Sequence, residues 1–113
     1  MKTSLLADAA SALKTLGTVL AGVLVLAAPV AANPELATAR LCMSCHAMQS
    51  KVVGPSLHDI ARRYAGQRDA ATRLAEKIRA GGAGAWGVVP MPANPKVTPD
   101  EARQLANWVL SLR

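Results

Sequence analysis

Large aromatic side chains and cysteines are both scarce in this sequence. Its 113 residues include one tyrosine, two tryptophans and no phenylalanine, and only two cysteines. A chain of this length forms one small domain. Small domains with few large apolar side chains need a disulfide, a metal or another group to complete the interior. We therefore expect an additional group in the core.

Acidic residues are scarce as well. The chain has 7 Asp and Glu against 13 Lys and Arg, a formal net charge of +6. Such a surface favours an acidic protein partner or an anionic membrane face, although a basic excess also serves solubility. We expect no nucleic-acid partner, because the sequence lacks the interleaving of aromatic and basic residues that single-strand binding uses.

Residues 1–32 have the pattern of a secretory signal peptide. A basic start precedes an uncharged apolar stretch from Leu16 to Ala28, and Val30-Ala31-Ala32 places small residues before a cleavage point at Asn33. The alternative is an uncleaved anchor that holds the domain at the periplasmic face, because residues 16–32 approach the minimum length of a membrane span. We predict cleavage, no stable membrane insertion afterwards, and a mature domain over residues 33–113 in the periplasm.

The most specific motif is the run Cys42-Met43-Ser44-Cys45-His46. Cys-x-x-Cys-His is the attachment signature of a c-type haem. Two thiols one helical turn apart can reach one edge of a porphyrin, and the following imidazole can take one axial iron site. A disulfide or thioredoxin-like redox pair is an alternative, but no strand precedes Cys42. A zinc site is another, and it would need ligands beyond His58.

Local signals predict the elements that precede the glycine-rich part of the chain. The first helix begins at Pro34, after an Asn N-cap, and runs to about Met43. Ser56 caps a second helix that continues to Tyr64.

Further signals cover the C-terminal half. Asp69 caps a third helix that stops at Gly81-Gly82. Thr98 and Glu101 form a capping box for the last helix. Residues 81–97 are predicted to form an ordered loop, and no strand is expected. The fold class is all-α.

A second axial ligand is needed if His46 binds iron. The candidates are Met43, Met48, His58 and Met91. The two nearer methionines are too close to the attachment point to reach the opposite face of the ring. Met91 lies 45 residues beyond His46, between Pro90 and Pro92, which stiffen the backbone. Methionine in an apolar stretch is usually core packing, but Met/His ligation of a haem is the cytochrome c pattern.

Together these motifs resemble class I cytochrome c, in particular the short bacterial type that donates electrons to dissimilatory nitrite reductase. The resemblance implies a small all-α fold of about four helices around one covalently bound haem c per chain, with Cys42 and Cys45 attached and His46 and Met91 as axial iron ligands. The matching segments, in order, are Cys42–His46, Val53-Gly54-Pro55, Ala85-Trp86-Gly87, Pro90-Met91-Pro92 with Asn94, and Leu105-Ala106-Asn107-Trp108-Val109.

The resemblance also implies roles around the iron ligands. Pro55 would offer its carbonyl to the ring N–H of His46, which fixes the tautomer of the ligand. Trp86 would donate its indole N–H to a haem propionate. Asn94 would donate its side-chain amide to the sulfur of Met91.

Some positions depart from the family pattern. Lys77 stands where an arginine often contacts a propionate, so a bidentate contact becomes a point charge. Ala37 and Leu41 replace an aromatic residue and a glycine in the first helix. These two changes bear on the close crossing of the first and last helices, across which Trp108 would pack.

The implied function is one-electron transfer at a high, positive potential, not enzymatic catalysis. The expected partners of a monomeric carrier are redox proteins such as a nitrite reductase, a terminal oxidase or other cytochromes. Two alternatives stay open from the residues. One is a haem enzyme or gas sensor in which Met91 is labile, and the other is a thiol-disulfide oxidoreductase that uses Cys42 and Cys45.

Overall fold

The computed structural model describes residues 22–23 and 34–112 of the chain. The elements in order are α1 (Pro34–Ala39), the 3-10 helix η1 (Cys42–Ser44), α2 (Leu57–Tyr64), α3 (Ala70–Ala80), β1 (Gly82–Gly84), β2 (Gly87–Met91) and α4 (Pro99–Ser111). The predicted signal peptide and its cleavage point lie outside the described residues, apart from residues 22–23. Within the described part, no helix has both the length and the apolar character that crossing a bilayer requires.

The first helix is shorter than predicted. It was expected to reach about Met43, but α1 ends at Ala39 and the chain turns at Leu41, which has a left-handed φ of 62°. The N–H of Leu41 donates to the Thr38 carbonyl at 3.0 Å, a tighter turn than an α-helix makes. This turn starts the separate helix η1, so the cysteine motif does not continue α1.

The predicted caps of α2 and α4 are confirmed. The hydroxyl of Ser56 accepts from the N–H of Asp59 at 3.0 Å. Thr98 and Glu101 form the full capping box, with Pro99 in the first turn. Such caps satisfy N–H groups that a helix start leaves without partners.

The third helix begins and ends where expected, but its N-cap residue differs in role. Asp69 occupies the N-cap position of α3 without a side-chain capping bond, and its carboxylate lies 3.6 Å from Arg73 instead. Gly81 ends the helix with a φ of 68°, a conformation that favours glycine.

The prediction of no strand was wrong. Residues within the expected loop form a two-stranded antiparallel hairpin, in which Gly82 pairs with Met91 and Gly84 pairs with Gly87. Glycine allows the positive φ angles at these turns. The two strands read Gly-Ala-Gly and Gly-Val-Val-Pro-Met, which do not alternate between apolar and polar residues, and all but one of their residues are exposed. A pattern search based on alternation therefore misses them.

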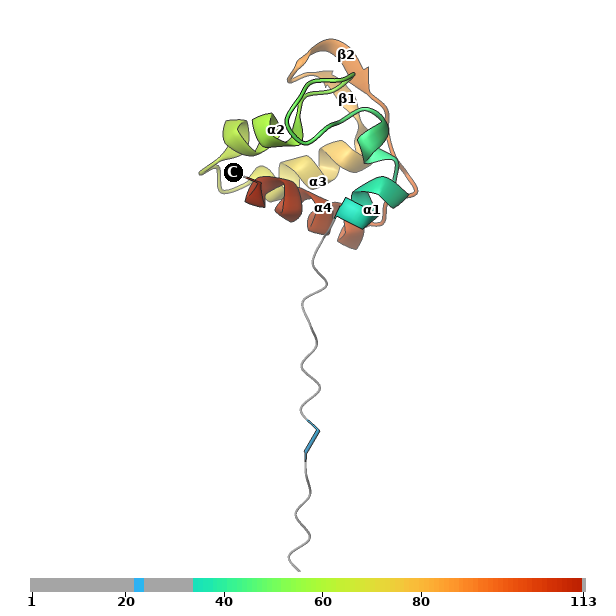
Figure 1. Ribbon diagram of the computed structural model, residues 1–113, viewed down its shortest axis with the longest axis vertical. Helices are drawn as coiled ribbons and strands as arrows, with labels where there is room; N and C mark the ends of the chain where they lie inside the picture. The colour runs from blue at the N-terminus through green and yellow to red at the C-terminus, as the bar shows by residue number, and fades with distance from the viewer. Residues whose placement is uncertain (1–21, 24–33, 113) are drawn as a thin grey trace, which may run out of the picture.

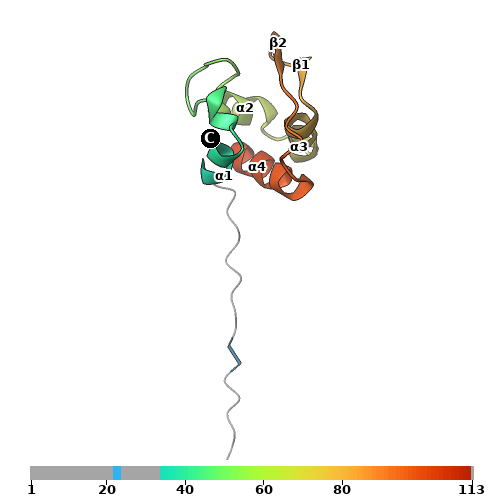
Figure 2. The same cartoon turned by 90° about the vertical axis from the view of Figure 1, so that its right-hand side faces the viewer.

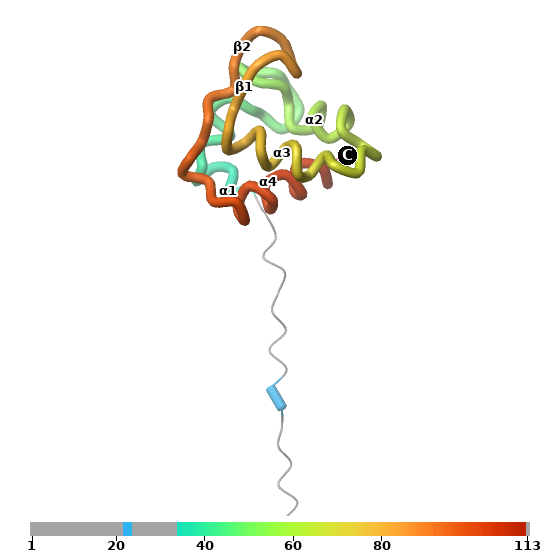
Figure 3. The backbone as a smooth tube through the Cα atoms, turned by 180° about the vertical axis from the view of Figure 1, so that it is seen from behind, coloured from blue at the N-terminus to red at the C-terminus, as the bar shows by residue number. Residues whose placement is uncertain are grey.

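Helix α3 lies between the hairpin and α4, as views from opposite sides show (Figures 1 and 3). The core follows α4 along its length. Among the described residues, half of the twelve buried hydrophobic side chains are alanines: Ala37, Ala61, Ala70, Ala75, Ala102 and Ala106. Small side chains allow the helix backbones to approach closely. They also mean that side chains contribute little volume to the interior.

The departures in the first helix do not prevent its contact with the last. Ala37 is 1% exposed and belongs to the same cluster as Ala102 and Ala106 of α4. Trp108 packs against that cluster and the neighbouring one. An alanine interface thus replaces the aromatic side chain at the crossing.

Candidate haem site

A cavity of about 270 Å³ is lined by residues of α2, α3 and α4 as well as of the loops. The loop between η1 and α2 stands on one side and the hairpin on the other (Figure 2). Side chains from both, and from α3 and α4, line the space. Its apolar lining includes Ile60, Leu74, Ile78, Val89, Leu105 and Val109. A wide apolar space in a chain with an alanine-rich core matches the expected additional group.

The cysteine motif forms one wall of this cavity. Cys42, Cys45 and His46 all line it, and the N–H groups of Cys45 and His46 both donate to the Cys42 carbonyl, at 3.2 and 3.0 Å. This turn brings the three side chains to the same wall. Both cysteines are free thiols, so they are chemically available for thioether formation.

The ring of His46 is fixed by its neighbours. Its Nδ1 lies 2.7 Å from the carbonyl oxygen of Pro55. Because a carbonyl can only accept, Nδ1 carries the hydrogen and Nε2 keeps a lone pair for a metal. Gly54 packs on the ring so closely that a Cβ at this position would lie 2.6 Å from Cε1. The structure therefore contains the expected Pro55 contact, and it supplies the reason for the glycine of the Val53-Gly54-Pro55 segment.

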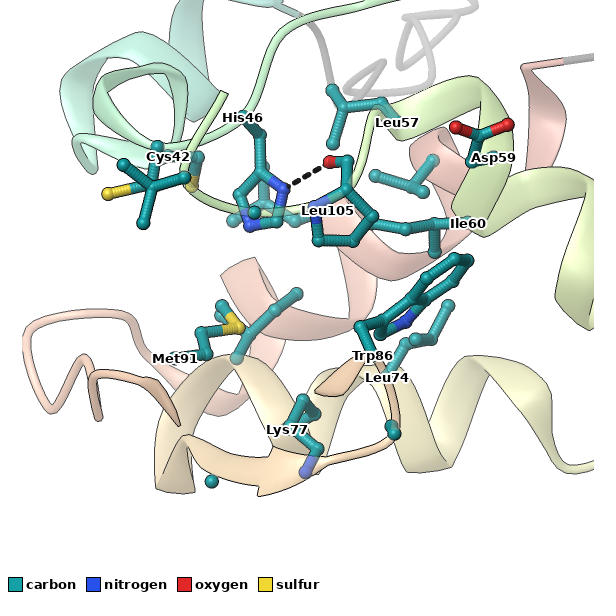
Figure 4. Close-up of a pocket in the computed structure, with 18 of the residues that line it drawn as sticks. Cys42, His46, Leu57, Asp59, Ile60, Leu74, Lys77, Trp86, Met91 and Leu105 are labelled. Atoms are coloured by element: carbon teal, nitrogen blue, oxygen red, sulfur yellow. Dashed lines mark hydrogen bonds between the residues drawn. The ribbon is translucent and has the colours of Figure 1, made fainter. Parts of the chain in front are cut away.

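Met91 lies across the cavity from His46 (Figure 4). Of the four candidates for a second ligand, it alone lines the cavity. Met43 and Met48 pack against core clusters instead. The Met91 segment packs directly against the end of α3. A Cβ added at Gly81 would collide with the carbonyl oxygen of Met91 and would lie 2.6 Å from Ala93 N, so only glycine fits at this contact.

The other predicted contact residues are divided between the cavity and its surroundings. Trp86 and Lys77 line the cavity, and the guanidinium of Arg63 lies over the indole ring of Trp86. Asn94 does not line it. Its amide nitrogen donates to the carbonyl of Arg40 at 2.9 Å.

The site does not favour the two haem-free alternatives. Burial raises the pKa of the Cys42 thiol, whereas a reactive redox thiol needs a lowered pKa. Among the described residues, no group of three or more His, Cys, Asp and Glu side chains is arranged to hold a metal ion. The donors present suit a haem that brings its own four nitrogen ligands and needs only axial ones.

Comparison with known proteins places the chain in a family. Residues 30–113 match the family described as Cytochrome c. The chain is 47% identical over 98 residues to cytochrome c-552 of Nitrosomonas europaea, covering 87% of this chain and 95% of the relative. It is 51% identical over 82 residues to cytochrome c-552 of Hydrogenobacter thermophilus, covering 73% and 83%.

The fold agrees with these similarities. The crystal structure of wild-type Nitrosomonas europaea cytochrome c552 matches with a TM-score of 0.70 at 48% identity, covering 72% of this chain and 100% of that one. The chain therefore belongs to the cytochrome c family. It is a short bacterial class I c-type cytochrome that carries covalently bound haem c and transfers electrons rather than catalysing a reaction.

Proposed function

We propose that this protein is a periplasmic electron carrier whose haem is attached through Cys42 and Cys45 and ligated by His46 and Met91. One observation carries the ligand assignment: Met91 faces His46 across the cavity that the cysteines line. The bound haem would exchange one electron at a time between its ferric and ferrous states.

The residues around the cavity would prepare both ligands in advance. Pro55 keeps the Nε2 lone pair of His46 directed away from its own carbonyl, and Gly54 fixes the plane of the ring. Gly81 fixes the backbone of Met91. Rigid ligands on both sides leave no coordination position for a substrate and require little rearrangement per electron, which suits transfer rather than catalysis.

The cavity would also set the sign of the potential. A ferric haem carries one more positive charge than a ferrous haem, and an apolar lining disfavours the more charged state. A thioether ligand such as Met91 favours the reduced state as well. We therefore expect a high, positive reduction potential.

Partners would meet the protein at the open side of the cavity. Val53 and Val89 line it and are 51% and 61% exposed. Their neighbours Val52 and Val88 are exposed as well. An apolar rim on a molecule with net positive charge suits transient contact with an acidic redox protein, such as a nitrite reductase or a terminal oxidase.

Spectra of the purified protein test the ligand assignment. Ferric wild-type protein should show the weak near-infrared band of a sulfur ligand, and colour should survive acid-acetone extraction. Met91→Leu should lose the band, whereas Met43→Leu and Met48→Leu, the matched controls, should keep it. Loss of the band from a control variant, or its survival in Met91→Leu, would contradict the assignment.

Cell fractionation tests the location. The haem-bearing protein should appear in the periplasmic fraction with Asn33 as its N-terminal residue. An intact N-terminus in the membrane fraction would support the anchored alternative instead.

A further inference from the structure

One hydrogen bond joins the segment before the cysteine motif to the segment after Met91. The amide nitrogen of Asn94 donates to the carbonyl of Arg40 at 2.9 Å, although the two residues are 54 positions apart. Arg40 lies two residues before Cys42, and Asn94 lies three residues after Met91. The bond therefore connects the two sides from which the ligands of the proposed function approach.

The Arg40 carbonyl is an acceptor directly after the last residue of α1. Such terminal carbonyls have no partner within their helix. The thiol of Cys42 lies 4.0 Å from the same oxygen. A cysteine sulfur in a thioether carries no hydrogen, so after haem attachment at Cys42 the Asn94 amide would be the side-chain donor to this carbonyl.

The side chain of Arg40 is held by α4. Its Nε and one terminal nitrogen donate to the two carboxylate oxygens of Glu101, at 3.1 and 2.6 Å. The Glu101 oxygen that accepts from Arg40 Nε also accepts from the N–H of Thr98 at 3.0 Å. A two-pronged pair with side chains only 33% and 21% exposed fixes Arg40 against the start of α4.

The bond to Arg40 also orients the Asn94 amide. Because the carbonyl can only accept, the amide nitrogen and not the amide oxygen must face it. The N–H of the Asn94 backbone donates to Arg79 at 3.1 Å, which fixes the chain at this residue. One hydrogen of the planar amide is thus committed to Arg40, and the direction of the second hydrogen follows.

We propose that Arg40 and Glu101 are positioning residues for the Met91 ligand, because they fix the carbonyl that orients the Asn94 amide. The second amide hydrogen is then presented to the Met91 sulfur in one direction, which selects one orientation of the thioether on the iron. This inference rests on the proposed His46 and Met91 ligation and on the contact from the Asn94 amide to the Met91 sulfur that the resemblance implies. It assigns a role to an ion pair outside the cavity.

The test compares two ion pairs of α4 in the haem-bearing protein. Arg40→Ala and Glu101→Gln break the pair that holds the Arg40 carbonyl. Asp100→Asn and Arg103→Ala break the exposed neighbouring pair. The readout is the proton NMR signal of the Met91 methyl group in the ferrous state, together with the ferric near-infrared band. Thermal unfolding is measured alongside, because both pairs can contribute to stability.

We expect the first two variants to broaden or split the methyl signal and to shift the near-infrared band, and Arg40→Lys to restore part of the wild-type behaviour. The control variants should keep the wild-type signal even where their unfolding temperature falls. An unchanged methyl signal in Arg40→Ala and Glu101→Gln would overturn the inference while leaving the ligation intact. Absence of a sulfur band from the wild-type protein would overturn the proposed ligation and this inference with it.

Discussion

The guanidinium carbon of Arg63 lies 4.4 Å from the ring centroid of Trp86. Arg63 is in the last turn of α2, and Trp86 is in the turn between β1 and β2. A cation over an indole face is attracted by the ring quadrupole. The contact therefore links α2 to the hairpin, and it holds the indole whose N–H is expected to reach a haem propionate.

Removing this cation should loosen Trp86. We expect Arg63→Gln to lower the free energy of unfolding of the haem-bearing protein by about 0.5–1 kcal/mol, the usual range for an exposed cation–π pair. Chemical denaturation measures the change. Arg68→Gln, at an exposed position between α2 and α3, is the control for loss of one positive charge. Equal effects of the two variants would show that the indole contact contributes nothing.

Two glycines with similar φ values allow the cost of a positive φ to be separated from the positioning of Met91. Gly66 and Gly81 have φ values of 76° and 68°, but only Gly81 is crowded, against the Met91 segment. Ala substitution should destabilise at both sites, by roughly 1 kcal/mol from the positive φ at Gly66. The cost should be larger at Gly81, because its ψ of −156° is open essentially only to glycine. Only Gly81→Ala should also weaken the near-infrared sulfur band. A band that is equally strong in both variants would show that Gly81 does not position Met91.

Leu41 occupies a backbone conformation that suits glycine. Its φ is 62° and the residue is 73% exposed. Burial of the leucine side chain therefore does not compensate for the backbone strain. Leu41→Gly should stabilise the protein by roughly 0.5–1 kcal/mol, which is the relief of left-handed strain minus the extra freedom of glycine in the unfolded chain. Leu41→Ala keeps the strain and should change little. Chemical denaturation of both variants checks this, and a destabilised glycine variant would contradict it.

The Arg40–Glu101 pair should make stability depend on pH. The hydrogen bond from Arg40 lowers the pKa of Glu101 from its ordinary 4.5. A carboxylate with a lowered folded-state pKa adds stability above its unfolded pKa and loses it as the pH falls through the folded value. The difference in unfolding temperature between wild type and Glu101→Gln should thus be largest near pH 7 and shrink below pH 4.5. A difference that stays constant down to strongly acidic pH would argue against an ionic contribution.

The cysteines should matter for folding as well as for colour. The double substitution Cys42→Ala with Cys45→Ala removes both proposed attachment points, and a small alanine-rich core then lacks its largest apolar component. We expect loss of cooperative thermal unfolding by circular dichroism along with loss of bound haem. Ser44→Ala, an exposed change in the same motif, should preserve both. A cooperatively folded double variant would contradict the prediction.

Local chemistry made much of this fold predictable. The caps at Ser56 and Thr98 and the stop at Gly81 depend on residues within a few positions of each other, so the sequence displays them directly. The end of α1 did not follow from local chemistry, because a leucine does not by itself indicate a left-handed turn. The one signal for it was the glycine that the family usually has at position 41. The exposed, glycine-rich hairpin lacked the alternation that identifies strands.

The contacts of the candidate site also differ in how far they could be predicted from local sequence. The Pro55 contact to His46 spans nine residues and was expected from the motif order. The Arg40–Glu101 pair spans 61 residues, and the Arg63–Trp86 contact joins a helix to a turn of the hairpin. Such pairings depend on how the helices cross, and neither charge nor periodicity in one sequence specifies their partners.

The alanine-rich interior has a consequence for the order of events during maturation. In the described part of the chain, half of the buried apolar residues contribute only a methyl group, so the polypeptide buries little apolar surface when it folds without haem. Haem attachment would then precede compaction, while Cys42 and Cys45 are still accessible to the enzymes that join them to the porphyrin. Only chains with attached haem would then fold completely, and chains without haem would remain susceptible to proteolysis.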